Sequence, residues 1–193
     1  MELNIVTIIY LFFRLAPFII VSYFSISAVF NQDIKGVIYL AGVVMATVLT
    51  IFIGNSLSDE YTTVTEKEAV CNMLTIGSTG TYSKIPLGIS ILSYTLIYLV
   101  YVIAKYRMEM YNLPTLILFP LLILGDALWN VKNNCFRPFG IFISILVGGS
   151  VGALWAYVID SIKQPKLQYF NIESDKTVCQ RPSKQLFKCT FKS

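Results

Sequence analysis

The chain has 193 residues, of which 55% are hydrophobic and 13% charged, with a net charge of +4 and a mean hydropathy of +0.67. Soluble domains usually carry about 25% charged residues, so this composition argues against a water-soluble domain. Because the chain has no histidine, it cannot by itself build the imidazole-dependent catalytic triads, haem sites or most zinc sites. We therefore expect an all-α integral membrane protein with no catalytic, cofactor or metal site.

The first hydrophobic regions predict two helices that cross the membrane. Runs of about 17–25 apolar residues can span the hydrocarbon core of a bilayer, and we expect such spans at residues 15–30 and 37–53. Arg14 and Pro17 interrupt the first region, so residues 5–13 are either a continuation of the span or a short interfacial helix. The short polar turn between the two spans predicts an antiparallel helical hairpin.

Three further spans are expected after residues 54–84, the only long loop between spans. They lie at residues 85–103, 113–129 and 139–159. The fourth is the least regular because it contains Pro114, Pro120 and Asp126, and a re-entrant or kinked helix is an alternative that would leave four spans. Residues 1–160 would then form the helical bundle, and residues 161–193 a basic tail.

The distribution of lysine and arginine predicts the orientation. Lys35, Lys105, Arg107 and the seven basic residues of the tail, ten in all, lie on one predicted side, against five on the other. This bias places the tail in the cytoplasm, and the N-terminus and the 54–84 loop on the opposite side.

Two ionisable residues, Arg14 and Asp126, lie in or near hydrophobic stretches. A charge at the centre of a bilayer costs at least about 2.5–3.5 kcal/mol, so such residues usually form a pair or line a cavity. One alternative is an ion pair inside the bundle, and another is an ion path past Asp126 and Asn130, which share a helix face. In the third alternative both charges simply reach the headgroup region.

The fifth span contains small residues at the spacing that lets helix backbones approach closely in lipid. These residues are Gly148, Gly149, Gly152 and Ala153. Packing against another helix of the same chain and contact with a second copy both fit this pattern, and the first is the favoured interpretation.

The tail combines basic residues with a pattern typical of a β-hairpin. Lys176, Arg181, Lys184 and Lys188 are candidates for contact with an acidic protein or an anionic membrane surface, although a solvated tail is the alternative. Two β-prone runs around Cys179 and Cys189, separated by a turn, would place these cysteines opposite each other for a disulfide. Thiols on a cytoplasmic face are normally reduced, which argues against that bond.

Three segments of the chain resemble a family of membrane proteins from nucleocytoplasmic large DNA viruses, including algal viruses and relatives of mimivirus. They are residues 176–189 (KTVCQRPSKQLFKC), 30–36 (FNQDIKG) and 129–135 (WNVKNNC). The resemblance implies a protein of the lipid membrane beneath an icosahedral capsid. Viruses of this group often carry a thiol oxidase, which would permit a Cys179–Cys189 bond in the cytoplasm.

The order of helices is also similar to that of type 2 phosphatidic acid phosphatases, but the histidines that perform their chemistry are absent. We therefore expect a structural virion protein that is anchored in lipid and contacts capsid or other virion proteins through its tail. A homo-oligomer is compatible with the sequence, and no nucleic acid partner is expected. A transporter that uses Asp126 and Asn130 is the main alternative, and a lipid-phosphate enzyme is a more remote one.

Overall fold

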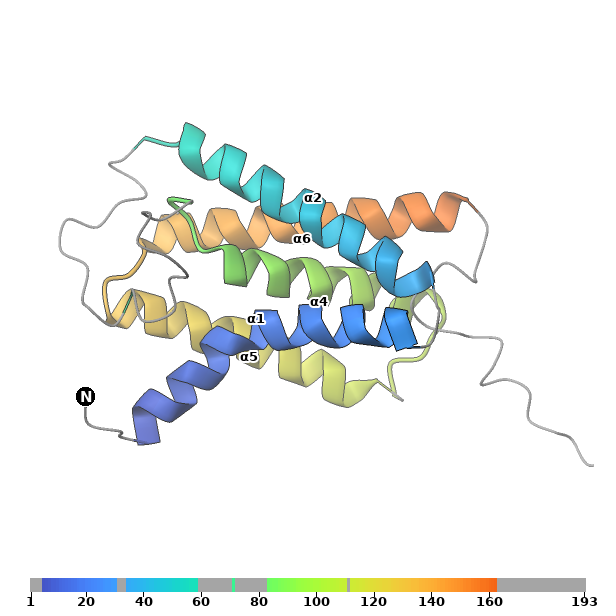
Figure 1. The fold of residues 1–193 in the computed structure, drawn as a ribbon, viewed down its shortest axis with the longest axis horizontal. Helices are drawn as coiled ribbons and strands as arrows, with labels where there is room; N and C mark the ends of the chain where they lie inside the picture. Colours follow the sequence, from blue (N-terminus) through green and yellow to red (C-terminus); the bar gives the residue numbers. More distant parts are fainter. Residues whose placement is uncertain (1–4, 31–33, 59–70, 72–82, 111, 163–193) are drawn as a thin grey trace, which may run out of the picture.

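The computed structural model describes residues 5–30, 34–58, 71, 83–110 and 112–162. The regular secondary structure of these residues is helical, and they contain no strand (Figure 1). The helices are α1 (Ile5–Phe30), α2 (Ile34–Ser56), α4 (Leu87–Lys105), α5 (Leu113–Lys132) and α6 (Pro138–Ser161). All five are long and apolar enough to cross a membrane. The expected tail hairpin lies outside the described residues.

Two helices that contain proline, α1 and α5, resolve alternatives that the sequence leaves open. α1 continues through Arg14 and Pro17 as one helix, so residues 5–13 are its continuation. It bends part-way along its length (Figure 1), as expected where a proline removes a backbone donor and crowds the preceding turn. α5 is one continuous helix of 20 residues, not a re-entrant pair of half-helices, with Pro114 in its first turn, where proline is tolerated.

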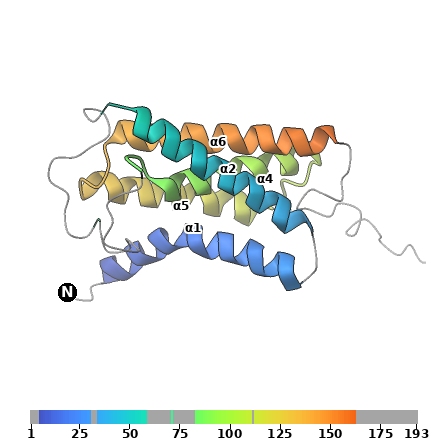
Figure 2. The ribbon, with the colours of Figure 1, turned by 45° about the horizontal axis from the view of Figure 1, so that its top comes forward.

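The helices alternate in direction between two ends of the bundle. Figure 1 shows the starts of α1, α4 and α6 and the ends of α2 and α5 at one end, which we call the loop end. The opposite end, where α6 finishes, is the tail end. Figure 2 shows α1 along one edge of the bundle and α6 along the other.

α4 is the central helix. It contacts each of the other four helices, and 56% of its apolar window is buried, against 33% or less in the others. Its hydroxyl side chains bond to its neighbours: Ser90 to Thr50 of α2 at 2.7 Å, Thr95 to Tyr39 of α2 at 2.6 Å, and Ser93 to the Ile145 carbonyl of α6 at 2.8 Å. Such hydrogen bonds hold helices together where the surroundings offer no aqueous partner.

The closest helix contact joins α6 to α4. A Cβ added at Gly148 or Gly152 would overlap the backbone carbonyl oxygens of Ser90 and Tyr94. Gly149 faces the side chains of α4, and Ala153 is half-buried. The structure therefore places this glycine pattern in a contact within the chain, the favoured one of the two alternatives.

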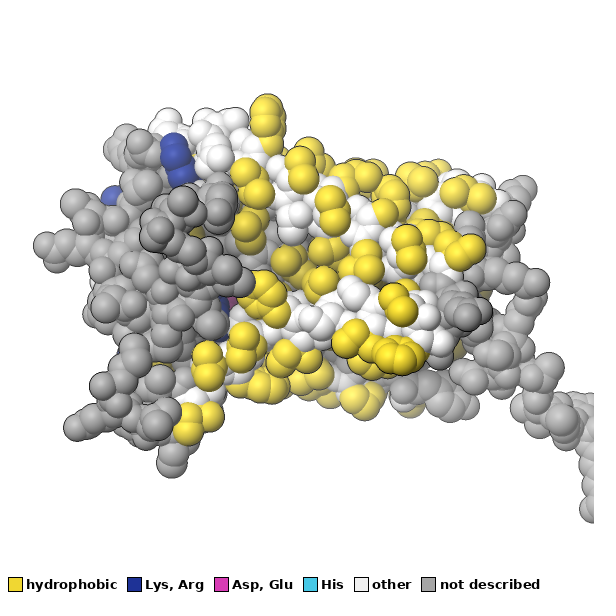
Figure 3. Space-filling view, viewed as in Figure 1, with side chains coloured by type: hydrophobic (Ala, Val, Ile, Leu, Met, Phe, Trp, Pro, Cys, Tyr) yellow, Lys and Arg dark blue, Asp and Glu magenta, His cyan; other side chains and the backbone are white. Residues whose placement is uncertain are grey.

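Large apolar side chains lie along the face of the bundle that Figure 3 shows. Exposed examples occur on α1, α2, α5 and α6, and include Phe18, Val44, Leu121 and Leu154. Buried polar side chains, by contrast, include Thr50, Ser90, Thr95, Asp126 and Asn130. The outside of the bundle is therefore apolar, unlike the polar outer face of helices in a water-soluble bundle, and its mainly apolar interior also holds polar side chains.

Candidate functional site

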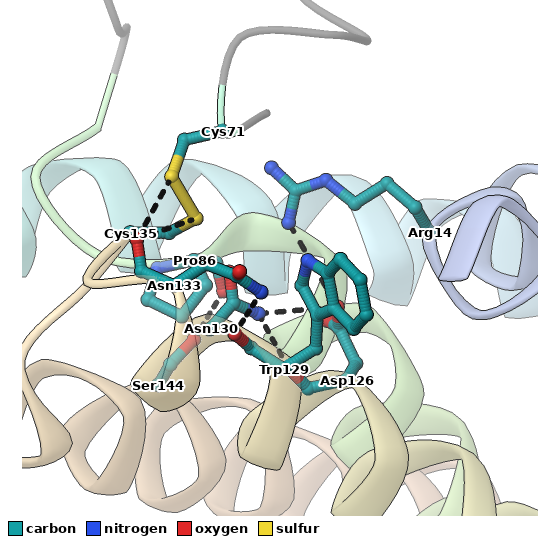
Figure 4. Close-up of polar contacts among 9 residues, drawn as sticks. All are labelled: Arg14, Cys71, Pro86, Asp126, Trp129, Asn130, Asn133, Cys135 and Ser144. Atoms are coloured by element: carbon teal, nitrogen blue, oxygen red, sulfur yellow. Dashed lines mark hydrogen bonds and ion pairs between the residues drawn. A yellow bond between two sulfur atoms is a disulfide. The ribbon is translucent and has the colours of Figure 1, made fainter. Parts of the chain in front are cut away.

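The candidate site lies near the loop end of the bundle, where α1 approaches α5. Asp126 and Asn130 are one turn apart on α5, so their side chains share one face of the helix. Arg14 extends from α1 toward them (Figure 4). Pro17 of α1 and Gly88 of α4 border the same place, since a Cβ at Gly88 would lie 3.2 Å from Pro17 Cγ and 3.9 Å from Asp126 Oδ2.

The carboxylate of Asp126 is buried and interacts with two side chains. Its side chain is 1% exposed, and its Oδ1 atom lies 3.9 Å from Nη1 of Arg14, whose side chain is 23% exposed. Asn130 Nδ2 donates to Asp126 Oδ1 at 3.1 Å and to the Asp126 backbone carbonyl at 2.7 Å. Of the alternatives for Arg14 and Asp126, the structure thus shows the ion pair inside the bundle.

Asn130 is fully buried and connects the pair to the end of α5. Its backbone carbonyl accepts the N–H of Cys135 at 2.9 Å, which closes the turn after the helix. Its side-chain Oδ1 is buried and has no hydrogen-bond partner among the residues that the structure describes. More than nine in ten buried polar groups in proteins have a partner, so this oxygen is an exception within the site.

A disulfide between Cys71 and Cys135 lies at the same end (Figure 4). It joins the 54–84 loop to the connection between α5 and α6, and the Asn133 carbonyl contacts Cys71 Sγ at 3.6 Å. The sequence does not predict a bond between these cysteines, which are 64 residues apart. The available signal was the topology, which places both residues on the same side of the bundle. Cys179 and Cys189 lie outside the described residues.

A second ion pair, also missed from the sequence, lies at the tail end. Lys105 at the end of α4 bonds to Asp160 near the end of α6, and the Tyr101 hydroxyl donates to the same carboxylate at 3.4 Å. This pair fixes the ends of the two most closely packed helices. The four residues of the tail that are predicted to contact a partner lie outside the described residues: Lys176, Arg181, Lys184 and Lys188.

The site contains only a few charged and polar side-chain groups. It offers one carboxylate, one amide and one guanidinium, and the described part of the chain contains no group of three or more His, Cys, Asp or Glu residues that could hold a metal ion. Such a set suits an electrostatic or binding role. Comparison with known proteins gives no match to a family model, a curated protein or a solved structure.

Proposed function

We propose that this chain is a multi-pass integral membrane protein in which all five described helices cross the bilayer. The observations that carry the proposal are the length and apolar character of all five helices and the apolar outer surface of α1, α2, α5 and α6. Soluble monomers rarely expose contiguous apolar patches larger than a few hundred Å², whereas lipid favours them. The hydrogen bonds from hydroxyl groups of α4 to α2 and α6 suit the same medium, since polar groups inside a membrane bundle bond across helices.

The Cys71–Cys135 disulfide supports one orientation of the bundle. Disulfides normally persist in oxidising compartments, so, unless a viral thiol oxidase forms it, this bond favours the side of the membrane away from the cytoplasm for the loop end. The excess of lysine and arginine on the tail side favours the same orientation by an independent argument. In this topology the tail, residues 163–193, extends into the cytoplasm.

The proposed role is structural: the bundle anchors the protein in the internal membrane of a large DNA virus particle, and the basic tail contacts capsid proteins. This part of the proposal rests on the resemblance of residues 30–36, 129–135 and 176–189 to that viral family. The tail carries seven basic residues against Glu173 and Asp175, so it suits an acidic protein face.

Site-specific photocrosslinking in assembled particles tests this role. A photoreactive amino acid in place of Lys184 in the tail should give cross-links to capsid proteins. The matched control is the same replacement at Lys67, which belongs to the loop on the other side of the membrane in the proposed topology. Equal cross-linking from both positions, or absence of the protein from the particle membrane, would contradict the proposal.

A further inference from the structure

The oxygen of the Asn130 side chain requires a partner that the described residues do not supply. The residue is fully buried, and its Oδ1 has no hydrogen bond. The orientation of the amide is fixed, because Nδ2 donates to two oxygen atoms of Asp126. Exchanging the amide oxygen and nitrogen would place oxygen against oxygen. The free acceptor therefore calls for a donor or a cation that the described residues do not supply.

The neighbouring carboxylate is also incompletely compensated. Arg14 Nη1 stands 3.9 Å from Asp126 Oδ1, whereas charge-assisted hydrogen bonds between such groups are about 2.7–2.9 Å long. The remaining side-chain bond to this carboxylate is the 3.1 Å contact from Asn130. A buried charge costs several kcal/mol unless close partners offset the loss of water, so Asp126 retains capacity for a positive ligand.

We infer that Asp126 and Asn130 form a binding site for a monovalent hard cation such as Na⁺, in competition with the guanidinium of Arg14. Hard cations prefer oxygen ligands, and the carboxylate and the free Asn130 Oδ1 provide them from one face of α5. Gly88 lacks a side chain that would fill the space beside Asp126.

The charge of the site favours a monovalent over a divalent ion. One carboxylate carries a single negative charge, while calcium and magnesium sites usually combine several oxygen ligands with more acidic groups. The described residues contain no larger cluster of metal-binding side chains. A single positive charge would neutralise Asp126 without excess.

Arg14 can give way to such an ion. Its side chain is 23% exposed, and the long apolar stem of an arginine allows its charged end to move to the surface. The guanidinium and the bound cation would then compete for one carboxylate, so Arg14 sets the affinity of the site. This inference does not depend on the proposed role in a virion.

Binding of ²²Na⁺ to the purified full-length chain in detergent, with choline as the replacement cation, tests the inference. The wild-type protein should bind saturably, and Asp126→Asn should abolish binding. Asp160→Asn is the matched control, because Asp160 is also paired with a cation but lies at the tail end; it should bind as the wild type does. Arg14→Gln should lower the Kd by roughly tenfold or more, since it removes a competing charge only 3.9 Å from the carboxylate.

Two results would overturn the inference. Saturable binding that persists in a folded Asp126→Asn variant would place the ion elsewhere. If Asp126→Asn does not fold, the Arg14→Gln variant decides. A Kd for Na⁺ equal to or higher than that of the wild type, or no saturable binding in either protein, would indicate that a water molecule, and not a cation, binds the Asn130 oxygen.

Discussion

At the scale of single residues, loss of Arg14 and loss of Asp126 should affect the stability of the protein differently. Asp126 is buried, whereas Arg14 is partly exposed and lies on the helix at the edge of the bundle. Removal of one partner from a buried pair is strongly destabilising when the remaining charge has no other partner, at about 3–5 kcal/mol. Arg14 without Asp126 can reach the surface, but Asp126 without Arg14 cannot.

We therefore predict an asymmetry between two substitutions in sodium-free buffer. Arg14→Gln should lower the melting temperature of the detergent-solubilised protein more than Asp126→Asn does, because it leaves a buried carboxylate without a counter-charge. Thermal unfolding followed by circular dichroism measures both. If Asp126→Asn proves the more damaging, Arg14 contributes little to the stability of the pair.

At the scale of the helices, the α4–α6 contact depends on the absence of side chains at two glycines. A Cβ at Gly148 would overlap the Ser90 carbonyl, which is backbone and cannot rotate away, whereas a Cβ at Gly149 would lie 3.3 Å from two side-chain atoms, Ile97 Cγ1 and Ser93 Oγ. The two adjacent glycines thus provide a matched pair for one substitution.

Gly148→Ala should destabilise the protein by about 1–3 kcal/mol, the usual cost of overpacking, and Gly149→Ala by less. Chemical or thermal unfolding in detergent compares the two variants. Because the contact lies within the chain, neither substitution should change the oligomeric state measured by light scattering. A dimer that dissociates only in Gly148→Ala would instead assign this face to a contact between copies.

The disulfide also acts at this scale, since it joins the 54–84 loop to the α5–α6 connection. Cys71→Ser should lower the stability by roughly 4 kcal/mol in the chain-entropy model for a loop of this size. Non-reducing digestion with mass spectrometry should recover Cys71 and Cys135 in one linked peptide. The same digest reports whether Cys179 and Cys189 are linked; recovery of Cys71 and Cys135 as free thiols would remove the argument from the disulfide for the orientation.

At the scale of the whole molecule, the helices could be predicted from the sequence but their polar contacts could not. Apolar runs long enough to span a bilayer fix where helices form, and four of the five begin within a few residues of the expected positions. α1 was expected to be shorter because Arg14 and Pro17 interrupt the apolar pattern. The helical backbone tolerates both, with a bend.

The pairing of residues distant in the sequence could not be predicted because it depends on how the helices are rotated against one another. The bonds of α4 to Thr50 and Tyr39 and the unpartnered oxygen of Asn130 all follow from that packing. The sequence does offer the Arg14–Asp126 ion pair as one alternative, because charged residues in apolar segments usually pair. The Cys71–Cys135 bond was missed because the local hairpin pattern around Cys179 and Cys189 was the more visible signal.

The central claim is that lipid surrounds the apolar outside of the bundle. Its most direct test is the reactivity of single cysteines with a water-soluble maleimide in membrane vesicles. Val44 and Leu121 lie in the middle of α2 and α5 and are 61% and 56% exposed in the isolated chain, while Met110 in the α4–α5 connection is 87% exposed. With Cys179 and Cys189 replaced by serine, Met110→Cys should react once the maleimide reaches the cytoplasmic side, and Val44→Cys and Leu121→Cys should remain unlabelled until detergent or denaturant exposes them. Equal and rapid labelling of all three positions in intact membranes would show that water covers these surfaces and would contradict the claim.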